Sequence, residues 1–172
     1  MENNIRIALT GFMGVGKTSV ARHLSLLLQC ERVDLDQAIE EFEQRRIVDI
    51  IDNDGEASYR EIETRCLERV LAESKAAILS LGGGAWSQPR NRDLIRSHGL
   101  TTVWLESSFE HCWQNIRASR KERPFARDRE SAKRLFDARQ MHYCLADWHF
   151  IIKPEHNSYN VAKQIAEEIF AV

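Results

Sequence analysis

The residues with the clearest chemistry form one glycine-rich stretch, Gly11–Thr18, with the sequence GFMGVGKT. Its glycines let the backbone come close enough to an anion for several N–H groups to point at phosphate oxygens. Lys17 can reach the β- and γ-phosphates of a nucleotide, and the Thr18 hydroxyl can bind Mg²⁺. The residues expected to contact the nucleotide are Gly11, Met13, Gly14, Val15, Gly16, Lys17, Thr18 and Ser19.

The flanking sequence supports a phosphate-binding loop. Residues 5–9 read as a buried strand that runs into the loop, and residues 19–28 read as a helix that leaves it. The start of that helix adds the positive end of its dipole to the site. A glycine turn of purely structural purpose would explain neither Lys17 nor Thr18, so phosphate binding is the favoured interpretation.

Two carboxylates, Asp34 and Asp36, follow the next predicted strand. In an extended segment this spacing places both on one side. At the carboxyl edge of a parallel sheet they would face the Mg²⁺ of the loop and a substrate hydroxyl. The alternative is a helix start, where acidic residues stabilise the helix dipole. The spacing alone does not separate the two interpretations.

Three glycines, Gly82, Gly83 and Gly84, directly follow a predicted buried strand over residues 76–81. A tight turn needs one or two, so three in a row indicate a ligand lying against bare backbone. On the preceding helix, over residues 56–74, Arg60 and Glu63 are three positions apart and therefore neighbours. Spacing alone favours an exposed ion pair over a buried arginine held for an anionic ligand.

The segment from Arg117 to Arg129 is basic and has little apolar periodicity. Most segments of this kind are solvated loops. The same composition also suits a lid that closes over bound phosphates and excludes water.

The remaining pattern alternates strands and helices five times, which predicts an α/β fold with a parallel sheet covered by helices on both faces. Further strands are expected over 31–34, 101–105 and 149–152, and Ser108 is expected to cap a helix. The polar helix over residues 37–46 is predicted to turn Ile39 and Phe42 inward.

Bulk composition narrows the functional classes. The chain has 172 residues, which suits one domain, and a net charge of −2, which argues against a dedicated nucleic-acid binder. No apolar run reaches membrane-spanning length. The four cysteines are widely spaced without a C-x-x-C pair and no signal peptide is evident, so we expect reduced thiols in a cytoplasm and neither disulfides nor zinc.

Five landmarks in order resemble the shikimate kinases, within the nucleoside-monophosphate-kinase-like group of phosphate-loop proteins. They are Gly11–Thr18, Asp34–Asp36, Gly55-Glu56 with Tyr59-Arg60 and Glu63, Leu81–Gly84, and Arg123-Pro124 followed by Arg139 and Tyr143. The resemblance runs from the first strand to the last helix.

This resemblance implies a P-loop NTPase fold, a three-layer sandwich whose five-stranded parallel sheet has the order 2-3-1-4-5. It implies one kinase domain over residues 1–172, with a substrate-binding helical region at about 35–74 and a lid at about 117–130. The implied reaction is Mg²⁺-dependent transfer of the ATP γ-phosphate to the 3-hydroxyl of shikimate, in aromatic amino-acid (chorismate) biosynthesis. The implied partners are ATP and shikimate only, for a monomer in the cytoplasm that binds neither nucleic acid nor membrane.

The resemblance also implies residue roles. Lys17, Asp36 and Arg123 would be catalytic, with Asp36 holding the substrate hydroxyls and Arg123 reaching the transferring phosphate from the lid. The predicted shikimate contacts are Asp36, Arg60, Glu63, Gly82, Gly83, Gly84 and Arg139, with Arg60 and Arg139 gripping the carboxylate and Glu63 orienting Arg60. The predicted metal contacts are Thr18 directly and Asp34 and Ser80 through water.

The sequence departs from the family pattern in several places. Phe125-Ala126 stands where two leucines are usual after the lid Arg-Pro, and Trp86, Ile51 and Tyr59 are further changes. The lid arm is about one residue short, which leaves open whether Arg117 or Arg120 stacks on the adenine. Residues 153–157 are not assigned to the adenine-side loop.

These departures keep two alternatives in view. One is a phosphate-loop kinase for another hydroxylated acid, such as quinate or gluconate, or for a nucleotide. The other is a non-catalytic binding module, against which the intact Lys17, Thr18, Asp36 and Arg123 argue.

Overall fold

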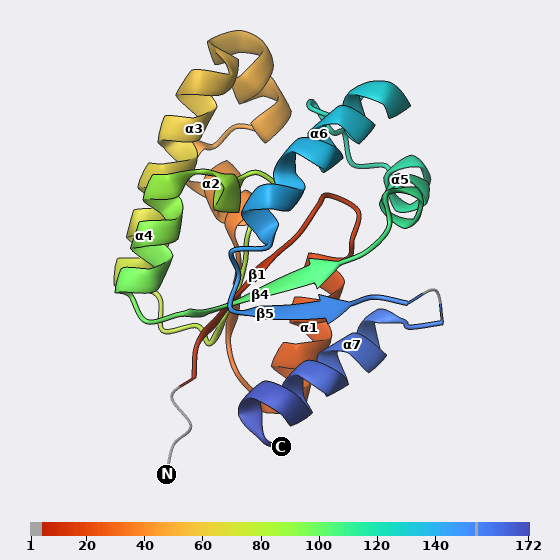
Figure 1. The fold of residues 1–172 in the computed structure, drawn as a ribbon. Coiled ribbons are helices and arrows are strands. Elements are labelled where there is room, and N and C mark those ends of the chain that lie inside the picture. Colours follow the sequence, from red (N-terminus) through yellow and green to blue (C-terminus); the bar gives the residue numbers. More distant parts are fainter. Residues whose placement is uncertain (1–4, 154) are drawn as a thin grey trace.

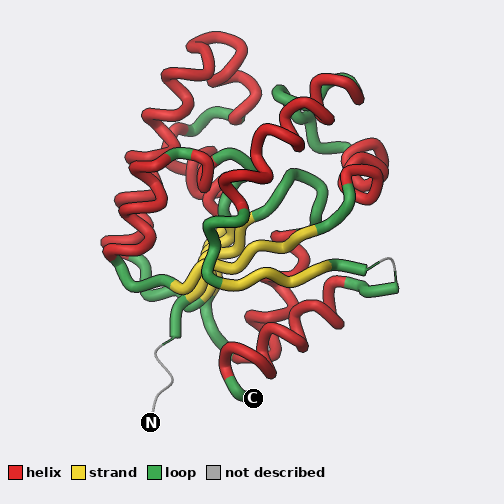
Figure 2. The backbone as a smooth tube through the Cα atoms, viewed as in Figure 1, coloured by secondary structure: helices red, strands yellow, loops and turns green. Residues whose placement is uncertain are grey.

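The structure, a computed structural model, describes residues 5–153 and 155–172. Its centre is a five-stranded parallel sheet with the order β2-β3-β1-β4-β5. Figure 2 shows the strands in the middle of the molecule, with helices around them. The strands are β1 Ile7–Thr10, β2 Arg32–Asp34, β3 Ile78–Ser80, β4 Thr101–Glu106 and β5 Trp148–Ile151. Both the parallel pairing and the strand order confirm the predicted fold class.

Helices cover the sheet on both faces, which gives three layers (Figure 1). Helices α1 and α7 pack together below the sheet in that view, and α3, α4 and α6 lie above it. The helices are α1 Lys17–Leu28, α2 Leu35–Glu43, α3 Ile47–Glu73, α4 Pro89–Ser97, α5 Phe109–Ala118, α6 Arg129–Tyr143 and α7 Ser158–Ile165, with a 3₁₀ turn at Ala85–Ser87 and a π turn at Ala166–Phe170.

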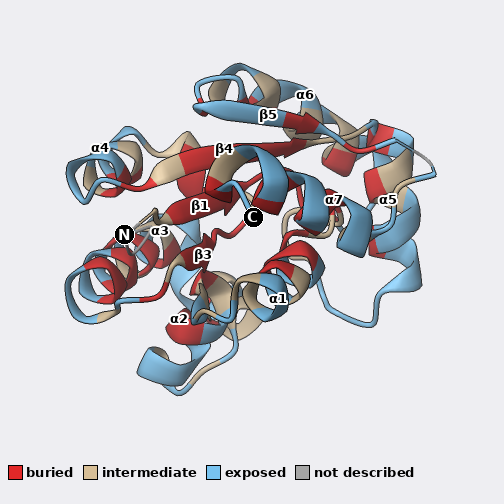
Figure 3. Cartoon of the chain, turned by 90° about the horizontal axis from the view of Figure 1, so that it is seen from below, coloured by how far each residue is buried: buried red, intermediate tan, exposed pale blue. Residues whose placement is uncertain are grey.

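The central strands form the core because both of their faces are covered. Every residue of β1 and β3 is buried, and the apolar run of β4 is buried as well (Figure 3). The edge strands β2 and β5 are partly exposed. In a parallel sheet all carboxyl ends lie at one edge, so this topology brings the loops after β1, β2 and β3 together.

Side-chain caps fix where several helices begin. Ser108 accepts a hydrogen bond from the backbone N–H of His111, which confirms the predicted cap of α5. The sequence pattern predicts a helix over residues 132–146, but Asp128 caps α6 in the same way, so that helix begins at Arg129, three residues earlier. The helix therefore includes Arg129, the last residue of the basic segment 117–129.

Two predictions about helix interiors had different outcomes. The sequence predicts a short helix over residues 47–52 that is broken at Asn53-Asp54-Gly55, and Gly55 interrupts α3 with a φ of +87°, which confirms the break. Ile39 is buried, but the prediction that Phe42 faces inward is wrong, because 41% of its surface is exposed. The Arg69 guanidinium lies 4.2 Å from the centre of its ring. A cation–π contact at the surface thus replaces burial in the core.

Candidate active site

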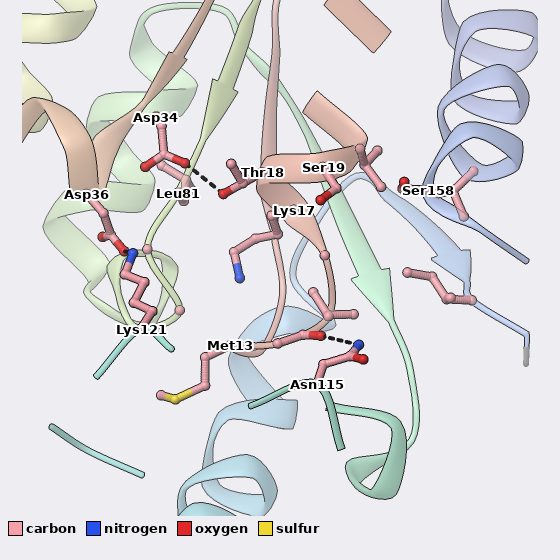
Figure 4. Close-up of a pocket in the computed structure, with 18 of the residues that line it drawn as sticks. Met13, Lys17, Thr18, Ser19, Asp34, Asp36, Leu81, Asn115, Lys121 and Ser158 are labelled. Carbon is pink, nitrogen blue, oxygen red and sulfur yellow. Dashed lines mark hydrogen bonds and ion pairs between the residues drawn. The ribbon is translucent and has the colours of Figure 1, made fainter. Parts of the chain in front are cut away.

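The glycine-rich loop leaves the carboxyl end of β1 and is packed too closely for side chains. A Cβ on Gly14 would lie 2.5 Å from the Cys112 carbonyl oxygen, and φ at Gly14 is +80°. The Gly14 carbonyl in turn accepts a hydrogen bond from Asn115 Nδ2 at 2.8 Å (Figure 4). The loop is therefore held by α5 in the conformation that its glycines permit.

Lys17 begins α1 and projects into the cavity beside the loop (Figure 4). Its ammonium donates hydrogen bonds to the carbonyls of Gly11 at 2.7 Å and Phe12 at 3.0 Å. Burial, and then the nearby Arg123 guanidinium, lower the pKa of Lys17 to about 8. A buried cation next to backbone N–H groups is an arrangement that stabilises phosphate oxygens.

Oxygen ligands suited to Mg²⁺ lie directly behind the loop. Thr18 Oγ1 donates to Asp34 Oδ2 at 2.8 Å, and Asp34 on β2 pairs in register with Ser80 on β3. Within residues 5–153 and 155–172, no group of three or more His, Cys, Asp or Glu side chains could hold a metal alone. This donor set fits Mg²⁺, which is bound by one or two protein oxygens plus waters and substrate phosphates.

Two cavities meet at this edge of the sheet. The larger, of about 720 Å³, contains the loop, Asp34 and the segment before α7. The second, of about 510 Å³, is lined by apolar residues of α3 and by lid residues. The residues shared by both are Met13, Asp36, Glu40, Gly83, Lys121 and Arg123. A group passing from one cavity to the other would therefore pass Asp36 and Arg123.

Arg60 and Arg139 converge in the second cavity. A Cβ on Gly84 would lie 2.5 Å from Arg60 Nη2 and 2.7 Å from Arg139 Nη2, so both guanidinium groups reach the same point. Arg60 Nε and Arg139 Nη1 are buried and have no hydrogen-bond partner among the described residues. Two cations with unused donors at one point form a site for a carboxylate.

The Glu63 carboxylate holds the Arg60 guanidinium in place. The side chain of Glu63 is completely buried and accepts from Arg60 Nη1 at 2.8 Å and from the Tyr59 hydroxyl at 3.1 Å. Burial raises the pKa of the Glu63 carboxyl, and Arg60 opposes that rise. Burial also works against the charge of Arg60, but the negative groups around it, Glu63 foremost, raise the pKa of the guanidinium. The exposed ion pair favoured by spacing alone is therefore wrong.

The three glycines lie where side chains would enter the site. A Cβ on Gly82 would lie 2.6 Å from Asp36 Oδ1, and one on Gly83 would lie 3.2 Å from Arg139 Nη1. The Tyr143 hydroxyl donates to the Gly83 carbonyl at 2.5 Å, and burial raises the pKa of this tyrosine to about 12. Bare backbone at these positions leaves room for a ligand between Asp36 and the two arginines.

Comparison with known proteins agrees with this geometry. The sequence profile described as "Shikimate kinase" matches residues 13–170. The chain belongs to the shikimate kinase family. It is accordingly an ATP-dependent phosphotransferase, as predicted.

Individual relatives match most of this chain. The shikimate kinase of Streptococcus thermophilus is 39% identical over 138 residues, covering 78% of this chain and 82% of the relative. That of Lactococcus lactis subsp. cremoris is 35% identical and covers 94% and 96%. A solved structure, described as shikimate kinase from Acinetobacter baumannii in complex with shikimate, has a TM-score of 0.88 at 30% identity and covers 97% and 93%.

Most of the predicted site residues come together, but Arg117 does not join them, and Trp86, one of the departures from the family pattern, lies outside the site. Arg117 lines a third cavity between α3, α5 and the lid, and not the loop cavity, whereas Arg120 lines the second cavity. Trp86 is fully buried and its indole N–H donates to the His142 carbonyl at 2.9 Å. Trp86 therefore packs in the core and does not narrow the substrate cavity.

Sequence reasoning missed several residues that line the site. Lys121 lies in the lid, and its ammonium is 3.3 Å from Asp36 Oδ2 across 85 positions of sequence (Figure 4). Asn115 and His111 line the loop cavity from α5. No local pattern marks Lys121 and Asn115, because each contacts a partner far away in the sequence, Asp36 and Gly14 respectively.

The remaining predictions concern the cysteines, membrane-spanning helices and residues 153–157. All four cysteines are free thiols. Among the described residues no helix is both long and apolar enough to cross a bilayer. Of residues 153–157, position 154 lies outside the described residues, while His156 and Asn157 line the loop cavity.

Proposed function

We propose that this kinase transfers the γ-phosphate of ATP to the 3-hydroxyl of shikimate, with ATP in the larger cavity and shikimate in the second. The convergence of Arg60 and Arg139 beside Gly84 carries the proposal, because it supplies a two-cation site for one carboxylate. The apolar wall of the same cavity, which includes Val48, Ile51 and Phe125, suits the carbon ring of the acid.

The phosphate side is arranged for charge neutralisation. Phosphoryl transfer has a loose transition state, so positioning and electrostatic stabilisation dominate its catalysis. Lys17 lines the larger cavity, and Arg123 lines both cavities where they meet. Burial lowers the pKa of Arg123, while Asp36 and Asp34 oppose that change. These cations would bind the oxygens of the transferring group, and the lid would exclude water.

Asp36 acts on the nucleophile. Its carboxylate lies at the junction of the cavities, beside the bare backbone of Gly82. There it accepts a hydrogen bond from the attacking hydroxyl, orients that oxygen and takes its proton late in the transfer. Lys121 is the cation paired with Asp36 before substrate arrives, so the incoming hydroxyl shares or replaces this contact.

Mg²⁺ would be held by Thr18 directly and by Asp34 and Ser80 through water, as their positions allow. When bound, it would neutralise negative charge on the phosphates of the nucleotide. We also propose that the chain works as one domain and as a monomer in the cytoplasm. Both cavities lie between elements of one folded unit, which supports the single-domain part of this proposal.

The test is ADP release from MgATP by the purified protein, with shikimate, quinate, gluconate and nucleoside monophosphates offered separately. We expect turnover with shikimate to exceed that with every other acceptor. Arg60→Ala should raise the shikimate KM and leave the ATP KM nearly unchanged. Preference for another acceptor, or ATP binding without turnover, would refute the proposal in favour of a redirected or non-catalytic site.

A further inference from the structure

A tight turn in the lid connects the two cavities. The backbone N–H of Ala126 donates to the Arg123 carbonyl at 2.9 Å, with Pro124 at the second position. Proline at this position fixes φ and makes the turn stiff. Ala126 is buried, which anchors the end of the turn. Arg123 and Phe125 are thus held in one rigid unit only two residues apart.

The two ends of this turn serve different cavities. Arg123 lines both cavities, whereas Phe125 lines only the second. The Arg60 guanidinium carbon lies 5.3 Å from the centre of the Phe125 ring and 5.0 Å from that of Tyr59. The Arg60 guanidinium therefore packs against an aromatic ring from the lid, Phe125, and against one from its own helix, Tyr59.

We infer that Phe125 is a positioning residue that couples the two substrate sites, by stacking on Arg60 while its turn presents Arg123 to the phosphates. The inference rests on the proposed function, in which Arg60 binds the substrate carboxylate. Phe125 stands where the family usually has leucine, so the aromatic contact is a property of this chain.

The contacts of Arg60 explain how the coupling operates. Glu63 holds one edge of the guanidinium, and Nε has no hydrogen-bond partner among the described residues. Glu56 Oε1 also lies 3.5 Å from Nη2, so the two carboxylates hold the edge of the guanidinium, and the ring faces of Tyr59 and Phe125 add a contact with its plane. The lid position that stacks Phe125 on Arg60 also places Arg123 at the cavity junction.

An ion pair also holds the lid in this position. Arg127, which follows the turn, forms an ion pair with Asp52 of α3 at 2.7 Å. Both side chains are largely exposed, so this pair contributes little by itself. Phe125 is thus the contact that links the turn to the carboxylate site. Coupling between two ligands is reciprocal, so shikimate should favour nucleotide binding as much as nucleotide favours shikimate.

The experiment measures the shikimate Kd by calorimetry with and without saturating MgADP, in the full-length protein. The readout is the ratio of the two constants. Phe125→Leu keeps an apolar side chain but removes the ring face, and Phe125→Tyr keeps the ring. Phe42→Leu is the matched control, because it removes another phenylalanine–arginine contact on the outer surface, away from both cavities.

In the wild type we expect MgADP to tighten shikimate binding, and Phe125→Leu to reduce the ratio by about two- to five-fold, as for loss of one cation–π contact. Phe125→Tyr and Phe42→Leu should keep the wild-type ratio. A ratio of one in the wild type, or an unchanged ratio in Phe125→Leu, would overturn the inference. A ratio lost equally in Phe125→Leu and Phe125→Tyr would also overturn it, because the aromatic contact would then not be the cause.

Arg60→Ala separates this inference from the proposed function. If Arg60→Ala leaves the shikimate Kd unchanged, the carboxylate assignment itself is wrong. If Arg60→Ala weakens shikimate binding and Phe125→Leu keeps the coupling, only the role of Phe125 fails. A thermal melt of each variant shows whether it is folded. If Phe125→Leu does not fold, Phe125→Met provides the same loss of the ring.

Discussion

Replacing Gly84 by alanine adds a single methyl group at the centre of the carboxylate site. The added carbon would lie 2.5 Å from Arg60 Nη2 and 2.7 Å from Arg139 Nη2. Ordinary van der Waals contact requires roughly 3.5 Å, so each guanidinium must withdraw by about 1 Å. Gly84 has a φ of −108° and a ψ of −9°, which alanine adopts without strain. The substitution therefore acts on the arginines and not on the backbone.

The expected cost is the loss of charge-assisted hydrogen bonds to the substrate. One such bond contributes about 1.5–3 kcal/mol, so losing one raises the shikimate KM by about 10- to 150-fold. The ATP KM should change little, because Gly84 lines only the second cavity. Alanine at a compatible position stabilises a fold by roughly 0.4–1 kcal/mol, which offsets part of the cost of moving Arg60 away from Glu63.

The assay is steady-state ADP release with shikimate varied at saturating MgATP, together with a thermal melt. Gly99→Ala is the converse control, because Gly99 has a φ of +71° and no neighbour within 4 Å of a Cβ. It should lower the melting temperature and leave both KM values unchanged. A Gly84→Ala enzyme with the wild-type shikimate KM would refute the assignment of the two arginines to the carboxylate.

Three further predictions concern the phosphates and the fold. Arg123→Ala should lower kcat by about 10³- to 10⁵-fold in single-turnover assays and leave ATP binding mostly intact, and near-normal turnover would refute its role. Because burial lowers the pKa of Lys17 to about 8, ADP affinity should fall as the pH rises through 8 and Lys17 loses its charge; titrations from pH 7 to 9.5 test this, and a flat profile would contradict it. Asp147 accepts hydrogen bonds from the N–H and hydroxyl of the buried Thr102, at 2.7 and 2.6 Å. Asp147→Ala should therefore cost about 1–3 kcal/mol of unfolding free energy in urea melts, with kcat unchanged.

Local sequence signals predicted the elements of this protein well where one physical rule decides the outcome. Hydrophobic runs identified the buried strands, and the glycines identified the loops at the carboxyl ends of β1 and β3. Helix ends were less predictable, as α6 shows, because a capping side chain decides where a helix begins. The outward position of Phe42 required knowledge of Arg69, which lies on another helix.

The site was predictable as far as its landmarks reach, and less so where it depends on contacts distant in sequence. The spacing of Arg60 and Glu63 is the same for an exposed and for a buried pair, and only the packing of α3 against the core decides between them. Lys121 meets Asp36 only because the lid folds back over α2. The roles of all these residues in catalysis stay predictions until variants are measured.

In the proposed reaction, this chain places a phosphate on one hydroxyl of shikimate. The most direct measurement is ³¹P and ¹H NMR of the product formed from MgATP and shikimate by the purified protein. We predict a single phosphate monoester, with the phosphorus coupled to the proton on carbon 3, and no such product from the Arg123→Ala variant on the same timescale. A phosphate on another oxygen, or ADP formed with inorganic phosphate alone, would contradict the proposed placement of Asp36, Arg60 and Arg139 around the substrate.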